Sequence, residues 1–135
     1  MPPELELARQ WLERASADLR AATLLAADAS LTGEVCFHCQ QAVEKAIKAY
    51  LTFKEIEFEY VHSIVYLLDL SAEGDEGFEQ FQQFAEPLTQ YAVRFRYPRS
   101  GSDPTPHEAR EALAAAEQIV TFVLQRLPPQ THPTS

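Results

Sequence analysis

The chain has 135 residues and is 46% hydrophobic, which is enough for one domain with its own apolar core. Its formal net charge is -9, which excludes broad, sequence-independent coating of nucleic acid but leaves room for a local basic pocket. The start of the chain lacks the pattern of an export signal, and no apolar run approaches the roughly 18 residues that a membrane-spanning helix needs. We therefore expect a cytoplasmic protein that does not enter a membrane.

The first half of the chain predicts two long helices. Apolar residues recur at alternating steps of three and four over residues 5–29, which is typical of a helix with one buried seam. The sequence "SLTG" then breaks the pattern, and a second helix is predicted over residues 34–53. "KEIEFEYVHS", residues 54–63, predicts a connection, because its weak apolar alternation has no partner strand in the sequence. A short helix, "SIVYLLDLSA", follows this connection.

The second half predicts two further long helices separated by a loop. The first of these begins at Phe78 and contains Pro87, a candidate kink, and residues 94–106 form the loop. Thr105 and Glu108 make a capping box for the last helix, which two prolines end after Leu127. The predicted fold is an all-α, antiparallel four-helix up-and-down bundle with an extra short helix. It forms one domain over residues 1–128, with a flexible C-terminal tail over residues 129–135.

Cys36 and Cys39 form a C-x-x-C pair, which is compatible with zinc binding, with redox chemistry or with neither. No second cysteine pair completes the four ligands of a structural zinc site, and no βαβ pattern surrounds the motif. On the predicted helix, Cys39 falls in the middle of the apolar face and Cys36 near its margin. We interpret both as small buried hydrophobic residues, and we expect neither a metal nor a cofactor.

The other side of the second helix presents a polar stripe. Its members are His38, Gln41, Lys45 and Lys48, at spacings of three, four and three. Such a stripe is often only a solvated helix face. A histidine, an amide and two ammonium groups in one row are also suited to binding a phosphate or a base edge.

A second group of cations lies in the predicted loop. Arg94, Arg96 and Arg99 are close in sequence, with Tyr97 among them. Clustered guanidinium groups favour bidentate phosphate contacts, and the tyrosine can stack on a base. The alternative is that these arginines pair with the surplus Asp and Glu of the chain.

Two histidines flank predicted helices. His62 precedes the short helix, where it either joins a polar site or caps that helix. His107 lies near the start of the last helix, where the helix dipole favours an anion and a neutral imidazole, as a general base requires. A solvated histidine is the alternative at that position.

Several of these motifs together resemble the HEPN domain. They are "ASADLRAATLL" at residues 15–25, "CFHCQQAVEKAIKAYL" at residues 36–51, His62, and the "YP" dipeptide that begins at Tyr97. The similarity covers residues 5–127. The most specific part is F-H-x-Q-Q-A-x-E-K-x-x-K, and the polar stripe occupies its polar positions.

The resemblance implies a helical bundle, usually a homodimer, that works with a minimal nucleotidyltransferase in a toxin–antitoxin-like pair. Many relatives are metal-free RNases with an R-x-x-x-x-H motif that tolerates two extra residues. Here seven residues separate Arg99 from His107, one more than that limit. Arg126 and His132 match the spacing. Arg126 stands just before a proline-rich tail and His132 lies within that tail, so we interpret the match as coincidence.

Three functional hypotheses follow. The first is a HEPN-like homodimer that acts with a nucleotidyltransferase partner and binds nucleotide or RNA in a cationic pocket. The second is a metal-independent endoribonuclease that uses Arg99 and His107. The third is a protein-interaction module without a ligand of its own.

Overall fold

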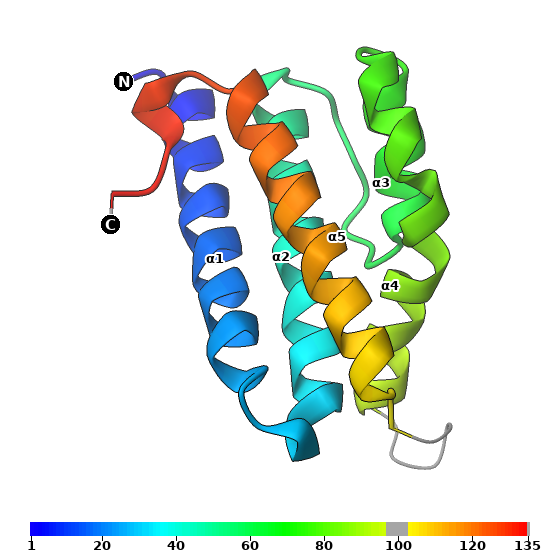
Figure 1. Cartoon of the computed structure of the whole chain (residues 1–135). Helices are drawn as coiled ribbons and strands as arrows, with labels where there is room; N and C mark the ends of the chain where they lie inside the picture. Colours follow the sequence, from blue (N-terminus) through cyan, green and yellow to red (C-terminus); the bar gives the residue numbers. More distant parts are fainter. Residues whose placement is uncertain (97–102, 135) are drawn as a thin grey trace.

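Five α-helices and three 3-10 turns make up the protein, in a computed structural model that describes residues 1–96 and 103–134. The helices are α1 (Pro3–Leu25), α2 (Thr32–Phe53), α3 (Ile64–Ala72), α4 (Gln82–Arg96) and α5 (Pro106–Arg126). Figure 1 shows α1, α2, α4 and α5 side by side, with α3 as the short additional helix. This arrangement confirms the predicted all-α bundle. No helix in the described part of the chain combines the length and apolar character required to cross a bilayer.

The helix ends differ from the prediction at two aspartates. α1 ends at Leu25 instead of continuing to residue 29, because the Asp28 side chain accepts a hydrogen bond from the Ser30 N–H and starts a 3-10 turn. Asp75 accepts from the Gly77 N–H in the same way, so residues 76–81 form a 3-10 turn and α4 begins at Gln82. Aspartate competes well for backbone N–H groups near its own position, which favours turns over helix interiors.

The capping box at the start of α5 is confirmed. The Thr105 hydroxyl accepts from the Glu108 N–H at 3.1 Å, and the Glu108 carboxylate accepts from the Thr105 N–H at 2.8 Å. Each bond satisfies one N–H that the first turn of a helix leaves without an intrahelical acceptor.

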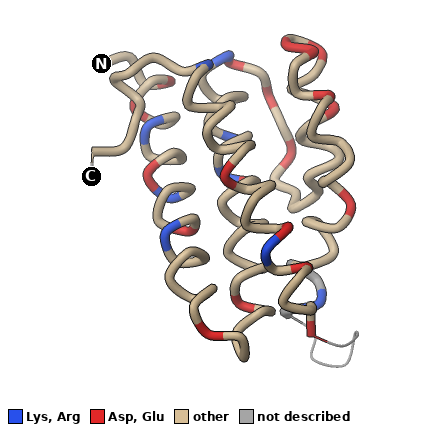
Figure 2. Tube along the Cα trace, in the orientation of Figure 1, with Lys and Arg blue, Asp and Glu red and all other residues tan. Residues whose placement is uncertain are grey.

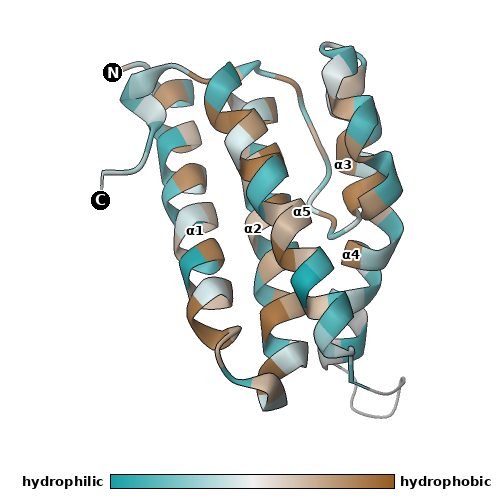
Figure 3. Ribbon diagram, in the orientation of Figure 1, coloured by the Kyte–Doolittle hydropathy of each residue, from teal (hydrophilic) through white to brown (hydrophobic). Residues whose placement is uncertain are grey.

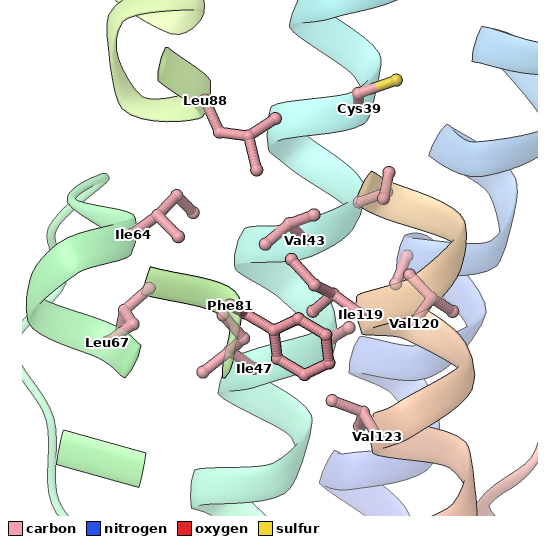
Figure 4. Packing of buried hydrophobic residues seen from close by; sticks show 14 of the residues in the cluster. Cys39, Val43, Ile47, Ile64, Leu67, Phe81, Leu88, Ile119, Val120 and Val123 are labelled. Carbon is pink, nitrogen blue, oxygen red and sulfur yellow. The ribbon is translucent and has the colours of Figure 1, made fainter. Parts of the chain in front are cut away.

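α2 is the central helix of the bundle and packs against α1, α3, α4 and α5. Figure 4 shows Cys39, Val43 and Ile47 of α2 among apolar side chains from α3, α4 and α5. Figure 3 shows brown, apolar stretches alternating with teal, hydrophilic ones around the helices, as expected when each buries one face. Because other helices cover α2 on most sides, its polar side chains can reach solvent only along a narrow part of its surface.

The chain after α5 contacts α1. Pro129–Thr131 forms a 3-10 turn that packs on α1, and Thr131 is buried. The His132 Nε2 donates to the carbonyl oxygens of Leu124 and Leu127, at 2.8 and 3.1 Å. The imidazole therefore satisfies carbonyl groups at the end of α5 that the helix itself leaves open.

An aromatic cluster surrounds Gly77. The Phe122 ring lies 4.9 Å from that of Phe78 and 5.0 Å from that of Phe81 between centroids. The Arg126 guanidinium covers Phe122 at 3.4 Å, so this ring has contacts on several sides. A Cβ atom at Gly77 would lie 2.8 Å from the Phe122 Cζ, which is closer than two carbon atoms can pack.

We predict that Gly77→Ala lowers the free energy of unfolding by about 1–3 kcal/mol, because the confined Phe122 ring would have to move. Gly74→Ala is the matched control, since its Cβ would meet nothing nearer than the Tyr50 hydroxyl at 3.7 Å. The control should stay within about 0.5 kcal/mol of the wild type. Urea unfolding followed by circular dichroism measures both, and equal midpoints for the two variants would contradict the packing argument.

Candidate functional site

The polar stripe of α2 is held from one side by Asp18 of α1. Asp18 Oδ1 lies 2.9 Å from the His38 Nδ1, and its Oδ2 accepts from the Lys45 Nζ at 2.6 Å. The Asp18 side chain is 13% exposed, and those of Lys45 and His38 are 23% and 31% exposed. One carboxylate thus positions two members of the stripe at the partly open edge between α1 and α2.

A second carboxylate, Glu44, organises the other side of the stripe. Its side chain is 5% exposed and accepts from the Lys48 Nζ at 2.9 Å and from the Gln40 Nε2 at 2.9 Å. The His62 Nδ1, from the connection between α2 and α3, lies 3.0 Å from the same carboxylate. Gln40 also donates to the His62 carbonyl oxygen at 3.2 Å and accepts from Gln41 at 2.6 Å. Glu44 therefore joins α2 to the connection that follows it.

The pKa of Glu44 reflects two opposing causes. Burial of the carboxyl raises its pKa, but hydrogen bonds from Gln40, Lys48 and His62 favour the charged form and together lower the pKa below its usual value. The Lys48 ammonium also lies 5.5 Å from the centroid of the Trp11 ring. Lys48 is therefore enclosed between a carboxylate and an aromatic face, and its side chain is 5% exposed.

These contacts bring together five predicted site residues, and they change the interpretation of the stripe. The five are His38, Gln41, Lys45, Lys48 and His62. Both lysines have carboxylate partners, so the stripe is a network of paired charges instead of a surface of free cations. Figure 2 shows the wider pattern along α1, where blue and red positions alternate.

Each histidine of the network faces a carboxylate through Nδ1. An ionised carboxylate only accepts, so the Nδ1 of His38 and of His62 carries the proton in these contacts. The Nε2 of each ring is then an acceptor in the neutral imidazole and a donor in the cation. His62 is 54% exposed, so its Nε2 can reach a ligand from solvent.

The second predicted group is only partly described. Arg94 is partly buried, with its guanidinium 5.9 Å from the centroid of the Tyr91 ring. The side chain of Arg96, together with Tyr97 and Arg99, lies outside the described residues. His107 pairs through Nε2 with Glu111 on the same face of α5, and both side chains are more than half exposed.

The two cysteines are buried on the side of α2 that faces the core, and both thiols are free. Burial raises the pKa of Cys36 to about 12 and that of Cys39 further. Thiolates are the reactive form of cysteine, so these side chains behave as small hydrophobic groups, as predicted. Within the described residues, no three His, Cys, Asp or Glu side chains gather as metal ligands.

Arg126 and His132, which match the RNase spacing, both have structural partners. The Arg126 Nε donates to Asp75 Oδ2 at 3.1 Å, and its guanidinium stacks on Phe122. His132 is bound to carbonyl oxygens at the end of α5. These contacts support the interpretation of the match as coincidence.

Sequence reasoning missed the two carboxylates that organise the network. Glu44 carried a usable signal, because it stands four residues before Lys48 on the same helix, the spacing of an ion pair. Asp18 carried no comparable signal, since its partners lie 20 and 27 residues away and meet it only through the packing of α1 on α2.

We predict that Glu44→Gln lowers the free energy of unfolding at pH 7 by about 3 kcal/mol, because it leaves the Lys48 ammonium buried without its counter-ion. Folding lowers the pKa of Glu44, so its contribution is present at neutral pH and is lost as pH falls through the folded-state pKa. The gap between wild type and variant should therefore narrow below about pH 4.

Urea unfolding across this pH range provides the measurement. Glu73→Gln, at an exposed position, is the control and should follow the wild type at every pH. A gap for Glu44→Gln that stays constant down to the acid limit would show that the carboxylate charge is not what stabilises this site.

The comparisons with known proteins agree with this architecture. The family model of the HEPN domain matches residues 8–127. TT1696 from Thermus thermophilus has a crystal structure with 33% sequence identity and a TM-score of 0.73, over 89% of this chain and 98% of that one. ST0689, an archaeal HEPN homologue, has 27% identity and a TM-score of 0.71, over 88% of this chain and 96% of that one. No curated protein matches the sequence. The length of the family match and the similarity to TT1696 show that the chain belongs to the HEPN domain family.

Proposed function

We propose that this HEPN protein acts in the cytoplasm with a minimal nucleotidyltransferase, as one half of a toxin–antitoxin-like pair, and binds nucleotide or RNA phosphates. The family match over residues 8–127 is the observation that carries the proposal. The polar positions of its most specific motif lie in two hydrogen-bonded groups on the same helix, one around Asp18 and one around Glu44 that includes His62, and this arrangement supports the proposal.

Exposure separates the residues that contact the ligand from those that hold the site. Lys45 is 23% exposed and has one carboxylate partner, so two of its three N–H donors remain for a phosphate. His38 and His62 offer their Nε2 atoms. Lys48 is enclosed by Glu44 and Trp11, so we assign it a positioning role. Arg94, Arg96 and Tyr97 are proposed to supply further phosphate and base contacts.

Metal-independent RNA cleavage is the catalytic form of the same proposal. Arg99 would stabilise the charge on the phosphate and His107 would transfer the proton, with the RNA's own 2′-hydroxyl as nucleophile. His107 is exposed, as a group that meets an RNA substrate must be, and its pairing with Glu111 orients the ring.

The second candidate function is a protein-interaction module without a ligand of its own. One observation favours it. Both lysines of the stripe are already paired with carboxylates, so an incoming anion has to share a cation with Asp18 or Glu44. An interaction module needs no such exchange.

We predict that ATP and a short single-stranded RNA bind at low salt and that Lys45→Ala weakens binding about tenfold or more, the value of one charge-assisted hydrogen bond. Affinity should fall as salt is raised, because phosphate contacts release counter-ions. Calorimetric titration at two salt concentrations measures both effects. The control is Arg20→Ala, which removes an exposed cation of α1 away from the network and should leave affinity unchanged.

The same samples distinguish the candidates. RNA cleavage that is lost in His107→Ala and in Arg99→Ala supports the RNase form. Binding without cleavage supports a ligand-binding role. If the wild type binds neither ATP nor RNA at low salt, the phosphate site is wrong and the interaction module is the better account.

We also propose that the protein is a homodimer, as the family resemblance implies. Closed two-fold dimers are the commonest soluble assemblies, and a bundle of this size has helix faces available for one. Light scattering at micromolar concentration should give twice the mass of one chain. A single species with the mass of one chain would exclude the dimer and any site shared between two copies.

A further inference from the structure

An open apolar groove lies between α1 and the connection that follows α2. Leu7 and Trp11 form its α1 side, and Ile56, Phe58 and Tyr60 form the opposite side. The groove has a volume of about 620 Å³, and none of the five predicted site residues lines it, although its Trp11 ring also contacts the Lys48 ammonium.

The walls of this groove expose aromatic and aliphatic surface to water. Tyr60 is 88% exposed and Leu7 is 48% exposed, although both are large apolar side chains. The rings of Phe58 and Tyr60 lie 6.1 Å apart between centroids, so the two form one continuous aromatic surface. A contiguous exposed patch of this kind marks an interaction surface more often than a solvated one.

The backbone beside the groove has no regular secondary structure and, among the described residues, no partner strand. Residues 56–59 have no helical or turn structure. The N–H groups of Ile56 and Glu59 are bonded, to the Leu51 carbonyl oxygen and to the Tyr66 hydroxyl. Within the described part of the chain, the N–H groups of Glu57 and Phe58 have no acceptor. This backbone therefore has free positions for an added strand.

The rim of the groove is acidic. Glu55, Glu57 and Glu59 are all exposed and alternate with the apolar residues that form the wall. Figure 2 shows red, acidic bands along this connection. Lys54 precedes the three glutamates in the sequence. The Lys54 ammonium lies 5.6 Å from the Phe53 ring centroid, so its charge is directed toward the helix end. The occupant that complements this rim is cationic.

We propose that residues 55–60 and the Leu7–Trp11 edge of α1 bind an extended basic segment of a partner protein, in which Lys or Arg alternates with apolar residues. The apolar side chains would fill the groove and the cations would meet the three glutamates. The segment's backbone would lie as a strand beside residues 57 and 58 and accept from the one of their two N–H groups that faces it, because neighbouring N–H groups of a strand point to opposite edges. A second copy of this chain is a poor occupant, because its own connection is acidic and its net charge is -9. The proposal is independent of the phosphate site.

The chain's single tryptophan makes the test direct, because Trp11 lines the groove. The probe is a short synthetic peptide in which lysine alternates with valine, with blocked ends. It should change Trp11 fluorescence saturably, and affinity should fall with salt. Glu57→Lys combined with Glu59→Lys should weaken binding about tenfold or more. The control is Glu73→Lys, which reverses an exposed charge at the end of α3 and should have no effect.

Further arms separate the components of the proposal. Tyr60→Ala should also weaken binding, and its 88% exposure means that the fold does not depend on this ring. Two versions of the peptide carry methyl groups on alternate backbone nitrogens. The version that loses the N–H groups facing the connection should no longer bind. Equal binding of both methylated peptides, of a glutamate–valine peptide or of spermine would overturn the proposal. The absence of any fluorescence response to the lysine–valine peptide would also overturn the proposal. A concentration-dependent dimer that the Tyr60→Ala substitution dissociates would overturn it as well.

Discussion

The buried carboxylate of Glu44 is the constraint on which the polar half of this structure depends. A charge that is almost fully removed from water is tolerated only when donors surround it. Glu44 has three, from Gln40, Lys48 and His62, and they come from two different segments of the chain. Satisfying this one group therefore helps to fix the path of the connection beside α2, together with Ile56 and Phe58, which pack against the core.

Charge pairing also explains how an acidic chain can place several cations on one helix. Asp18 and Glu44 neutralise the lysines of the stripe, and the two histidines share the same carboxylates. Each histidine then keeps one ring nitrogen that no carboxylate contacts. The charges are thus paired without a ligand, and the histidines still have ring nitrogens that a ligand can contact. Its two lysines differ in depth, with Lys48 inside and Lys45 at the edge.

The sequence allowed the helices and one cap to be predicted, because periodicity and capping are local. The capping box at Thr105 and the burial of Cys39 follow from spacing on a single helix. The ends at Asp28 and Asp75 were predicted wrongly, because each aspartate bonds a backbone N–H two residues on and starts a new turn. The stripe was visible from its spacing, but its pairing with Asp18 was not. That contact depends on how α1 is rotated against α2, which no single helix specifies. The groupings proposed for Arg99 and Tyr97 fall outside the described residues and stay predictions.

Trp11 takes part in two surfaces at once. One contact of its ring is the Lys48 ammonium, which in turn is bonded to Glu44, and the same side chain lines the groove beside the connection. A segment that settles in the groove and turns this ring alters the environment of Lys48, and a ligand that reorders the Glu44 network alters the ring. Thermodynamic linkage then requires each of the two ligands to change the affinity for the other by the same factor. If both proposed sites bind their ligands, the Trp11 ring is the physical contact through which a protein partner and a small anion would affect each other.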